Sequence, residues 1–207
     1  MNKHAVSDLE IRRLAELGVA TVYEGAGQAG LIDAPLIQLM PGSRAAGPAR
    51  TVLCAQDDNL AVHAAIEQIR PGEVVVLTMP EPRPVALMGD LLAIQIKVCG
   101  AAAILVDAGV RDVEELARLG VPVWTRFVRA RAATKKKAGT INVTVTIADT
   151  QIADGDIIVL DTDGAVRVER ERVAQVLAAA EERCGREERL REQLLAGRTT
   201  YDLLGLR

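Results

Sequence analysis

Polar residues that suit chemistry stand at two places where an apolar run gives way to a predicted helix. The first is Gly89-Asp90-Leu91-Leu92, at the start of a helix predicted over 89–99. A glycine there lets a ligand approach closely, and the free backbone N–H groups of a first helical turn form a cradle for a carboxylate. The same residues also suit an ordinary helix start, in which Asp90 caps the first turn. The pattern alone leaves both interpretations open.

The second place is the segment 107–112, where a buried strand ends in a turn of small residues and then presents Arg111 and Asp112 side by side. Ligands bind preferentially at the C-terminal ends of strands in α/β sheets. A carboxylate such as Asp112 suits a hard divalent cation, and the guanidinium of Arg111 suits negative charge on a substrate. The alternative is an exposed arginine beside a helix-capping aspartate. Two such junctions in sequential strand–helix units favour a site for a small anion.

Three further patterns are weaker. Asn59 and His63 are four residues apart and therefore share one face of a predicted helix, where a histidine is more often a packing residue than a ligand. Glu187 falls on the apolar stripe of the predicted C-terminal helix. A carboxylate on a packing face needs a partner, either a metal site or an arginine across a subunit interface, unless the stripe ends before it. The run 135–137 of three lysines indicates a solvated charged loop.

Composition narrows the classes of function. The 207 residues are 49% apolar and 26% charged, which indicates one soluble domain over 1–207. With 25 Lys and Arg against 28 Asp and Glu, the net charge of −3 disfavours a nucleic-acid partner. Aromatic residues make up only 2%, so a base-stacking platform is excluded. Three scattered cysteines argue against a disulfide framework or a zinc site, and no apolar run predicts a membrane span or signal peptide, so we expect a cytoplasmic protein.

Helical and strand patterns alternate in the first two thirds of the chain, and a β-rich stretch and a long helix follow. This order predicts an α/β fold, with a parallel core, an added antiparallel layer and no linker. A capping box at Ser7 and Glu10 marks the first helix. The predicted helices are 7–18, 21–28, 60–68, 89–99, 113–119 and 170–196, and the predicted strands are 49–55, 74–78, 103–106, 121–124, 141–147, 157–160 and 165–168.

The two junctions together resemble the motif of a known enzyme family. Gly89-Asp90-Leu91-Leu92 is followed, after a spacer of twenty residues from Asp90, by Arg111-Asp112-x-x-Glu115. This pattern resembles that of the class II 4-hydroxy-4-methyl-2-oxoglutarate/4-carboxy-4-hydroxy-2-oxoadipate aldolases. The likeness covers nearly the whole chain, and the fold is shared with the regulator of ribonuclease E activity A. Supporting stretches lie at 20–24, 58–63, 106–110, 122–124, 161–164 and 201–207.

The resemblance implies a fold, an assembly and a reaction. The implied fold is a three-layer β/β/α sandwich with a long C-terminal helix, assembled as a homotrimer or homohexamer with the active site between subunits. The implied reaction is cleavage of a small 4-hydroxy-2-oxo acid to pyruvate through a metal-stabilised enolate, with oxaloacetate decarboxylation as a side activity. Magnesium or manganese is the implied cofactor. The alternative from the same fold is a non-catalytic regulator that binds a protein of the ribonuclease E type.

The resemblance also implies roles for single residues at the two junctions. The backbone N–H groups of Gly89 to Leu92 would bind the pyruvyl carboxylate, and Arg111 would stabilise the enolate oxygen. Asp112 would ligate the metal. Asp90 would hold a metal-bound water and take part in proton transfer.

Three residues outside the junctions acquire roles in the same way. Glu187, contributed by a neighbouring subunit, resembles the family's glutamate near the metal, while Asn59 and His63 resemble polar residues that line the pocket. The chain departs from the family pattern in a Pro-rich loop before Gly89 and at 133–136, where Ala-Thr-Lys-Lys replaces a Gly-Thr-x-Lys element. These two segments are expected to touch the part of the substrate distal to pyruvate.

Overall fold

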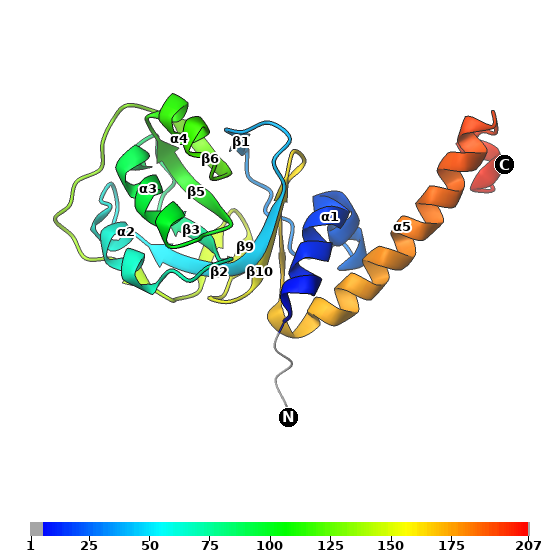
Figure 1. Cartoon of the computed structure of the whole chain (residues 1–207), viewed down its shortest axis with the longest axis horizontal. Helices are drawn as coiled ribbons and strands as arrows, with labels where there is room; N and C mark the ends of the chain where they lie inside the picture. Colours follow the sequence, from blue (N-terminus) through cyan, green and yellow to red (C-terminus); the bar gives the residue numbers. More distant parts are fainter. Residues whose placement is uncertain (1–5, 207) are drawn as a thin grey trace.

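One long strand, β2 (Ala45–Leu53), organises the fold because its two halves pair with strands of opposite direction. In the computed structural model, which describes residues 6–206, the C-terminal half of β2 runs parallel to β3 (Val74–Thr78). Its N-terminal half runs antiparallel to β10 (Ile157–Asp161). The parallel core and the antiparallel layer are therefore joined through one continuous strand, β2 (Figure 1).

The parallel side of the sheet carries the loops that form the candidate site. Within residues 6–206, nine strands form one sheet in the order β1-β6-β5-β3-β2-β10-β11, with β4 added at β5 and β7 at β2. Strands β8 and β9 make a separate two-stranded sheet. The remaining strands are β1 (Ile37–Gln38), β4 (Ala86–Met88), β5 (Ala103–Val110), β6 (Val123–Val128), β7 (Thr140–Ile141), β8 (Val145–Ile147), β9 (Thr150–Ile152) and β11 (Gly164–Val168).

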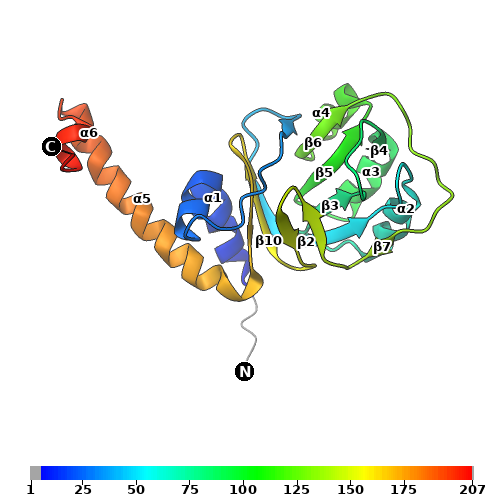
Figure 2. The same cartoon turned by 180° about the vertical axis from the view of Figure 1, so that it is seen from behind.

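Three apolar clusters fill the spaces between layers. The first joins the parallel strands to α2 (Leu60–Ala65), α3 (Asp90–Val98) and α4 (Val113–Leu119). The second lies between the other face of these strands and β8, β9 and β10, and contains the buried ring of Trp124, whose indole N–H donates to the Asp161 carbonyl oxygen at 2.8 Å. The third joins β10 and β11 to α1 (Asp8–Gly25) and α5 (Val173–Leu195). The layers are visible from both sides (Figures 1 and 2), and the predicted α/β fold with its long C-terminal helix is confirmed.

The N-terminal helix α1 follows the sequence pattern closely. The capping box is formed, with the Glu10 backbone N–H donating to Ser7 Oγ and the Ser7 backbone N–H donating to Glu10 Oε2. The two predicted helices of this segment are one element with a kink at Gly18, whose φ of 80° is not helical. A side chain at Gly18 would overlap the carboxylate of Asp161, which accepts the Val19 N–H at 2.9 Å.

Several strand predictions differ from the structure in their bounds, and two of the differences shape the fold. The single strand expected over 141–147 is wrong: it is divided into β7 and β8 because Asn142 lies in the left-handed region, with φ of 59°, and turns the chain between two sheets. Strand β5 continues four residues beyond the predicted 103–106, and all eight of its residues are buried. The short elements η1 (Ile66–Gln68), η2 (Arg170–Arg172) and α6 (Thr200–Leu203) complete the fold.

The long helix α5 packs against α1 at its beginning and then extends away from the sheets (Figure 1). Its buried residues are Val173, Val176 and Ala180, all in the first third of the helix. Beyond Ala180, the apolar stripe predicted for this helix is therefore not buried by the described part of the chain. Among the described residues, no helix combines the length and apolar character needed to cross a membrane.

We expect Gly25→Ala to destabilise the junction of α1 and α5. An added Cβ would lie 2.8 Å from both the Cβ and the backbone N of Ala180, and such overpacking costs about 1–3 kcal/mol. Urea unfolding would measure the loss. Ala180→Gly in the same chain should restore only part of it, because backbone atoms of residue 180 remain in the way. An unchanged unfolding free energy would show that the contact is not tight.

Candidate functional site

One pocket brings the two predicted junctions together with two other polar segments. It has a cavity volume of about 100 Å³ and is bordered by α3, by the end of β5, by the start of α2 and by the segment 132–135. Its polar lining residues are Asn59, His63, Asp90, Arg111 and Lys135, and its other lining residues are Ala86, Met88, Gly89, Leu91, Leu92, Ala132 and Ala133. Of the nine residues predicted for the site, the pocket collects seven, and Asp112 lies directly beside them.

The start of α3 has the features of an anion cradle. Gly89 occupies the capping position of α3 in extended conformation and provides no side-chain cap. The first N–H groups of a helix lack partners within the helix and lie at its positive dipole end. Asp90 Oδ1 accepts the Leu91 N–H at 2.8 Å, as the capping interpretation of Asp90 expects. A bound carboxylate would compete with the Asp90 side chain for this N–H group.

The side chains of the second junction require a glycine at position 89. A Cβ at this position would overlap Asp112 Oδ2 and lie 3.1 Å from Arg111 Nε and 3.2 Å from Arg111 Cγ. Its φ of −134° is open to any residue, so the constraint comes from space and not from backbone conformation. The glycine thus allows the acidic and basic side chains to approach the helix start.

Asp112 links the two junctions directly. Its Oδ2 accepts the Asp90 backbone N–H at 3.3 Å and lies 3.3 Å from Arg111 Nε. Its backbone is left-handed, with φ of 56° and ψ of 45°, a conformation that aspartate tolerates better than most residues. This turn redirects the side chain at the point where β5 ends and α4 begins. Both side chains remain partly exposed, so they are available to a ligand.

Asn59 contributes a buried acceptor to the pocket wall. Its Nδ2 donates to the Leu87 carbonyl oxygen at 2.8 Å, which orients the amide because the carbonyl can only accept. The other amide atom, Oδ1, is buried and has no hydrogen-bond partner among residues 6–206. His63 lies one turn further along α2, is exposed and borders the same pocket. The predicted shared face of Asn59 and His63 is therefore a pocket wall.

The opposite lysine-rich segment is held by a buried carboxylate that the sequence analysis did not single out. Asp58 is 0% exposed, and its Oδ2 accepts the Thr134 hydroxyl at 2.5 Å and the Lys136 backbone N–H at 2.7 Å. Burial raises the pKa of Asp58, but hydrogen bonds from the Thr134 hydroxyl and from three backbone N–H groups outweigh it, so the pKa lies well below its ordinary value. Lys135 consequently lines the pocket and is not only part of a solvated run.

Acid is expected to remove the contribution of Asp58 to stability. An unfolded aspartate has a pKa of about 3.9, and the folded pKa is lower. The contribution is therefore complete above about pH 4 and is lost as the pH falls through the folded pKa. Urea unfolding of the wild type and of Asp58→Asn should differ by about 2–3 kcal/mol near neutral pH and by clearly less at about pH 3. A constant difference would contradict this.

Asp107 is a second buried acid that sequence reasoning passed over as a functional residue. It lies on β5, five residues before Asp112, and forms an ion pair with Arg126 of β6. Burial raises the pKa of Asp107, and the hydrogen bond and charge of Arg126 oppose the rise. The pair joins β5 to β6 where their register shifts between Val106 and Gly109.

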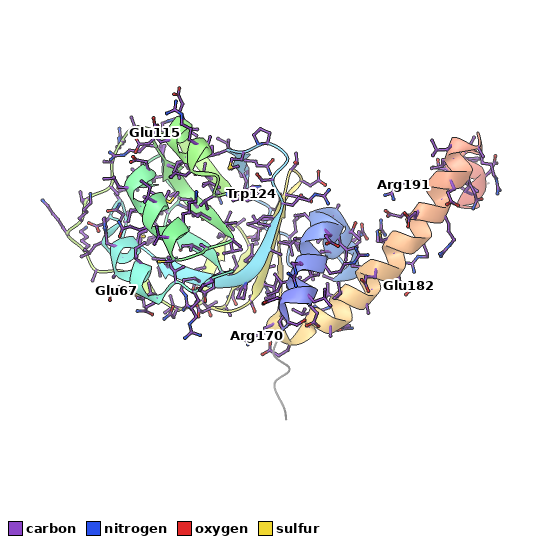
Figure 3. All side chains as sticks on the ribbon, viewed as in Figure 1. Glu67, Glu115, Trp124, Arg170, Glu182 and Arg191 are labelled. Atoms are coloured by element: carbon purple, nitrogen blue, oxygen red, sulfur yellow. The ribbon has the colours of Figure 1, made fainter. Side chains whose placement is uncertain are left out.

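Two segments lie apart from the pocket. Glu187 is on the projecting part of α5, where its carboxylate pairs with Arg183 at 2.9 Å and Arg191 at 3.4 Å. In Figure 3, Arg191 on α5 and Glu115 on α4 stand at opposite ends of the molecule. The structure of one chain therefore does not bring Glu187 to Asp112.

The Pro-rich loop before Gly89 also lies outside the pocket lining. It packs against the segment before α2 instead, with Arg83 paired to Asp57 at 3.4 Å and the Glu81 N–H donating to Gln56 Oε1. The expectation that this loop and the Ala133 region both touch the substrate thus finds support only for Ala133, which borders the pocket.

The arrangement of acidic residues suits a cation that takes few protein ligands. Within residues 6–206, no group of three or more His, Cys, Asp or Glu side chains could hold a metal ion. Magnesium, however, usually keeps several waters and binds through one or two carboxylates plus substrate oxygens. The partly exposed carboxylate of Asp112, with Asp90 as its neighbour, fits that mode of binding.

The family model and several of the similar proteins relate this chain to aldolases and RraA proteins. Residues 19–167 match the family model described as RraA-like, Aldolase/RraA. A protein of Halalkalibacterium halodurans named "putative 4-hydroxy-4-methyl-2-oxoglutarate aldolase" is 34% identical over 137 residues, which span 66% of this chain and 65% of that protein. A protein of the same name from Burkholderia multivorans is 38% identical over 60% of this chain and 75% of its own length.

Solved structures extend the similarity to almost the whole fold. Streptomyces coelicolor RraAS2, described as an unusual member of the RNase ES inhibitor RraA protein family, has a TM-score of 0.80 and 26% identity over 91% of this chain and 100% of its own. An uncharacterised protein from Pseudomonas syringae pv. tomato has a TM-score of 0.88 over 100% of this chain and 98% of its own, at 20% identity. The second similarity concerns the fold alone.

Proposed function

Because this chain belongs to the RraA-like family of aldolases and RraA proteins, we propose that it is a divalent-metal-dependent aldolase. It cleaves a 4-hydroxy-2-oxo acid to pyruvate and decarboxylates oxaloacetate as a side activity. The observation that carries this proposal is the pocket in which the start of α3 meets Arg111, with Asp112 in contact with both. The names of the relatives support the same class of reaction.

Different residues of the pocket bind different groups of the substrate. The N–H groups at the start of α3 bind the carboxylate next to the 2-oxo group, displacing the Asp90 carboxylate from the Leu91 N–H. Arg111 then faces the 2-oxo oxygen. As the C3–C4 bond breaks, its electron pair moves toward that oxygen and the 4-hydroxyl group loses its proton. The fixed positive charge of Arg111 stabilises the developing negative charge.

Proton transfer falls to the carboxylate freed from the helix start. Asp90 is partly exposed and borders the pocket, so its carboxylate can take the proton that leaves the 4-hydroxyl group and, after the C3–C4 bond has broken, give that proton to C3 to complete pyruvate. Asp112, with Asp90 as neighbour, would hold magnesium or manganese. The cation, when bound, supplies a second positive charge that draws electrons from the 2-oxo acid.

We also propose that the complete site needs a second copy of the chain. Asp112 borders an open depression of about 540 Å³ that nothing in the described part of the chain fills. Glu187 is carried by a helix that extends away from its own body, and the same helix ends in exposed apolar side chains such as Leu195. A homotrimer or homohexamer would bring Glu187 of one copy to Asp112 of the next.

Mixing two inactive variants tests this shared site. Arg111→Ala and Glu187→Ala, each strongly impaired alone, are expected to regain part of the activity when unfolded and refolded together, because some interfaces then carry two intact halves. The matched control is the double variant, which carries both substitutions on one chain and is unfolded and refolded by itself. Absence of recovery would place Glu187 outside the site.

Pyruvate release from oxaloacetate tests the activity itself. Purified protein, magnesium and oxaloacetate would be coupled to a dehydrogenase that reports pyruvate, with magnesium and oxaloacetate alone as the blank. We expect release above the blank, its loss on adding EDTA and its return with excess magnesium. Release no faster than the blank would reject the proposal.

A second candidate function follows from one similarity, that to RraAS2. A non-catalytic regulator would bind a protein of the ribonuclease E type and would be indifferent to Asp112→Ala. Capture of purified ribonuclease E by both the wild type and Asp112→Ala, without pyruvate release by either, would favour this alternative.

A further inference from the structure

Strand β5 carries an extra residue against its neighbour β6 shortly before it reaches the pocket. The register of the two strands changes by one residue between Val106 and Gly109. Within that interval two residues of β5, Asp107 and Ala108, lie opposite a single residue of β6, Arg126. An extra residue of this kind is a β-bulge, which bends its strand and redirects the side chains that follow. The bulge therefore stands where it can set the direction of the basic and acidic side chains after β5.

Two side chains of β6 bond to the two residues of the bulge. Arg126 Nε donates to the carboxylate of Asp107, which is 1% exposed. The hydroxyl of Thr125, which is fully buried, donates to the Ala108 carbonyl oxygen at 2.9 Å. A bulge disrupts the ladder of backbone hydrogen bonds, and a buried polar group left without a partner costs stability. The ion pair and the hydroxyl thus hold the irregular stretch in place.

The other edge of β5 is irregular at the same level. There Ala86 of β4 pairs with Gly109, and Met88 pairs with the next residue of β5, Val110, so the register shifts again. The Gly109 N–H donates to the Val85 carbonyl oxygen at 2.9 Å, and an added Cβ at this glycine would lie 2.8 Å from that oxygen. Since Met88 is the last residue before the start of α3, these pairings also set the distance between α3 and the end of β5.

The bulge reaches the candidate site through backbone hydrogen bonds. The Arg111 N–H donates to the Met88 carbonyl oxygen at 3.1 Å, and Asp112 Oδ2 accepts the Asp90 N–H at 3.3 Å. Without the extra residue, the pairing of β5 beyond the bulge would move by one residue. Because side chains alternate along a strand, a shift of one residue carries them to the opposite face. The guanidinium of Arg111 would then leave the pocket.

We propose that Asp107, Arg126 and Thr125 are positioning residues, which hold the bulge and thereby set Arg111 and Asp112 against the start of α3. The lining of the pocket does not include any of the three, so they act only through the backbone of β5. Their effect on catalysis rests on the proposed function. Their effect on the backbone can be measured on the protein alone.

Amide hydrogen exchange, followed by NMR, tests the bulge without a substrate. Thr125→Val replaces the hydroxyl by a methyl group of similar size. Thr51→Val is the matched control, because Thr51 is also fully buried and its hydroxyl donates to the Val143 carbonyl oxygen at 2.7 Å, but in a regularly paired part of β2. We expect Thr125→Val to speed exchange of the Arg111 N–H about tenfold more than Thr51→Val does, because only the first loosens the end of β5.

Steady-state kinetics of pyruvate release from oxaloacetate test the consequence for the site. Thr125→Val should lower kcat about tenfold or more and change KM by less than about twofold. The reason is that Arg111 and Asp112 act on charge that develops during the reaction, whereas the start of α3 still binds the carboxylate. Thr125→Ser, which keeps the hydroxyl, should retain most of kcat, and Thr51→Val should retain wild-type kinetics.

A double variant tests the ion pair in the same way. Asp107→Asn combined with Arg126→Gln removes both charges, so that neither is left alone in a buried position. It should speed exchange of the Arg111 N–H and lower kcat as Thr125→Val does. It decides the question if Thr125→Val does not fold.

Three results would overturn the proposal. They are equal exchange of the Arg111 N–H in Thr125→Val and Thr51→Val, an unchanged kcat in Thr125→Val despite faster exchange, or an equal loss of kcat in both variants. Absence of pyruvate release by the wild type is a separate result, which rejects the proposed function. The exchange experiment would then still decide whether these side chains fix the end of β5.

Discussion

Arg111→Ala is expected to lower kcat/KM for pyruvate release from oxaloacetate by about 10²–10³-fold, which is the usual cost of removing a group that stabilises developing negative charge. The reason lies in its position: the guanidinium borders the pocket at the end of β5 and pairs with Asp112, so under the proposed function it would face the substrate beside that acidic group. Most of the loss should appear in kcat, because the charge develops during bond cleavage.

Arg118→Ala provides the matched control for Arg111. This arginine lies on α4, is exposed and pairs with Glu114 and Glu115, so its loss should change kcat/KM by less than twofold. Equal activities of Arg111→Ala and the wild type would remove Arg111 from the reaction. Arg111→Lys should recover little, because a lysine cannot offer the planar pair of donors.

Gly89→Ala is expected to reduce kcat/KM by about 10²-fold or more without unfolding the protein. The new methyl group would overlap the carboxylate of Asp112 and press on Arg111, and a displacement of about 1 Å at a reacting group can cost about 10²-fold. The backbone at residue 89 is extended, so alanine fits it without strain. Thermal unfolding midpoints and steady-state kinetics, measured on the same preparations, would separate the two effects.

Gly185→Ala is the matched control for this substitution. Residue 185 lies in the middle of α5, and apart from its chain neighbours and the helix backbone the nearest heavy atom to an added Cβ there is Arg189 Nη1 at 3.8 Å. The variant should keep full activity and gain about 0.5–1 kcal/mol of stability, because alanine is a better helix former. If Gly89→Ala keeps wild-type kinetics, the start of α3 is not in contact with the reacting groups.

The sequence predicted the two junctions because each leaves a local signature. Gly89-Asp90 and Arg111-Asp112 lie at the ends of short apolar runs, where both a helix start and a strand end can be recognised from neighbouring residues. Their meeting in one pocket follows from the parallel pairing of β4 with β5, which brings both strand ends to one edge. The spacing of the motif along the sequence does not by itself show that the two junctions lie close together.

Asp58 and Lys135 could not be connected in the same way. They are 77 residues apart, and the three lysines have the composition of a solvated loop. Only the fold shows that a buried carboxylate gathers backbone N–H groups from that loop. Similarly, the alternation of apolar residues over 141–147 predicted one strand, whereas the left-handed backbone of Asn142 turns the chain. Hydrophobic periodicity does not report the backbone conformation of a single residue.

The position of β2 in the sheet has a consequence for the order in which its strands pair during synthesis. Its parallel partner β3 begins 21 residues after β2 ends, whereas its antiparallel partner β10 begins 104 residues after that end. During synthesis, the C-terminal half of β2 can therefore pair early, while its N-terminal half presents unpaired N–H and C=O groups until β10 emerges. The layer that supports α1 and α5 closes last, and a nascent chain halted before β10 would offer this strand edge to other chains.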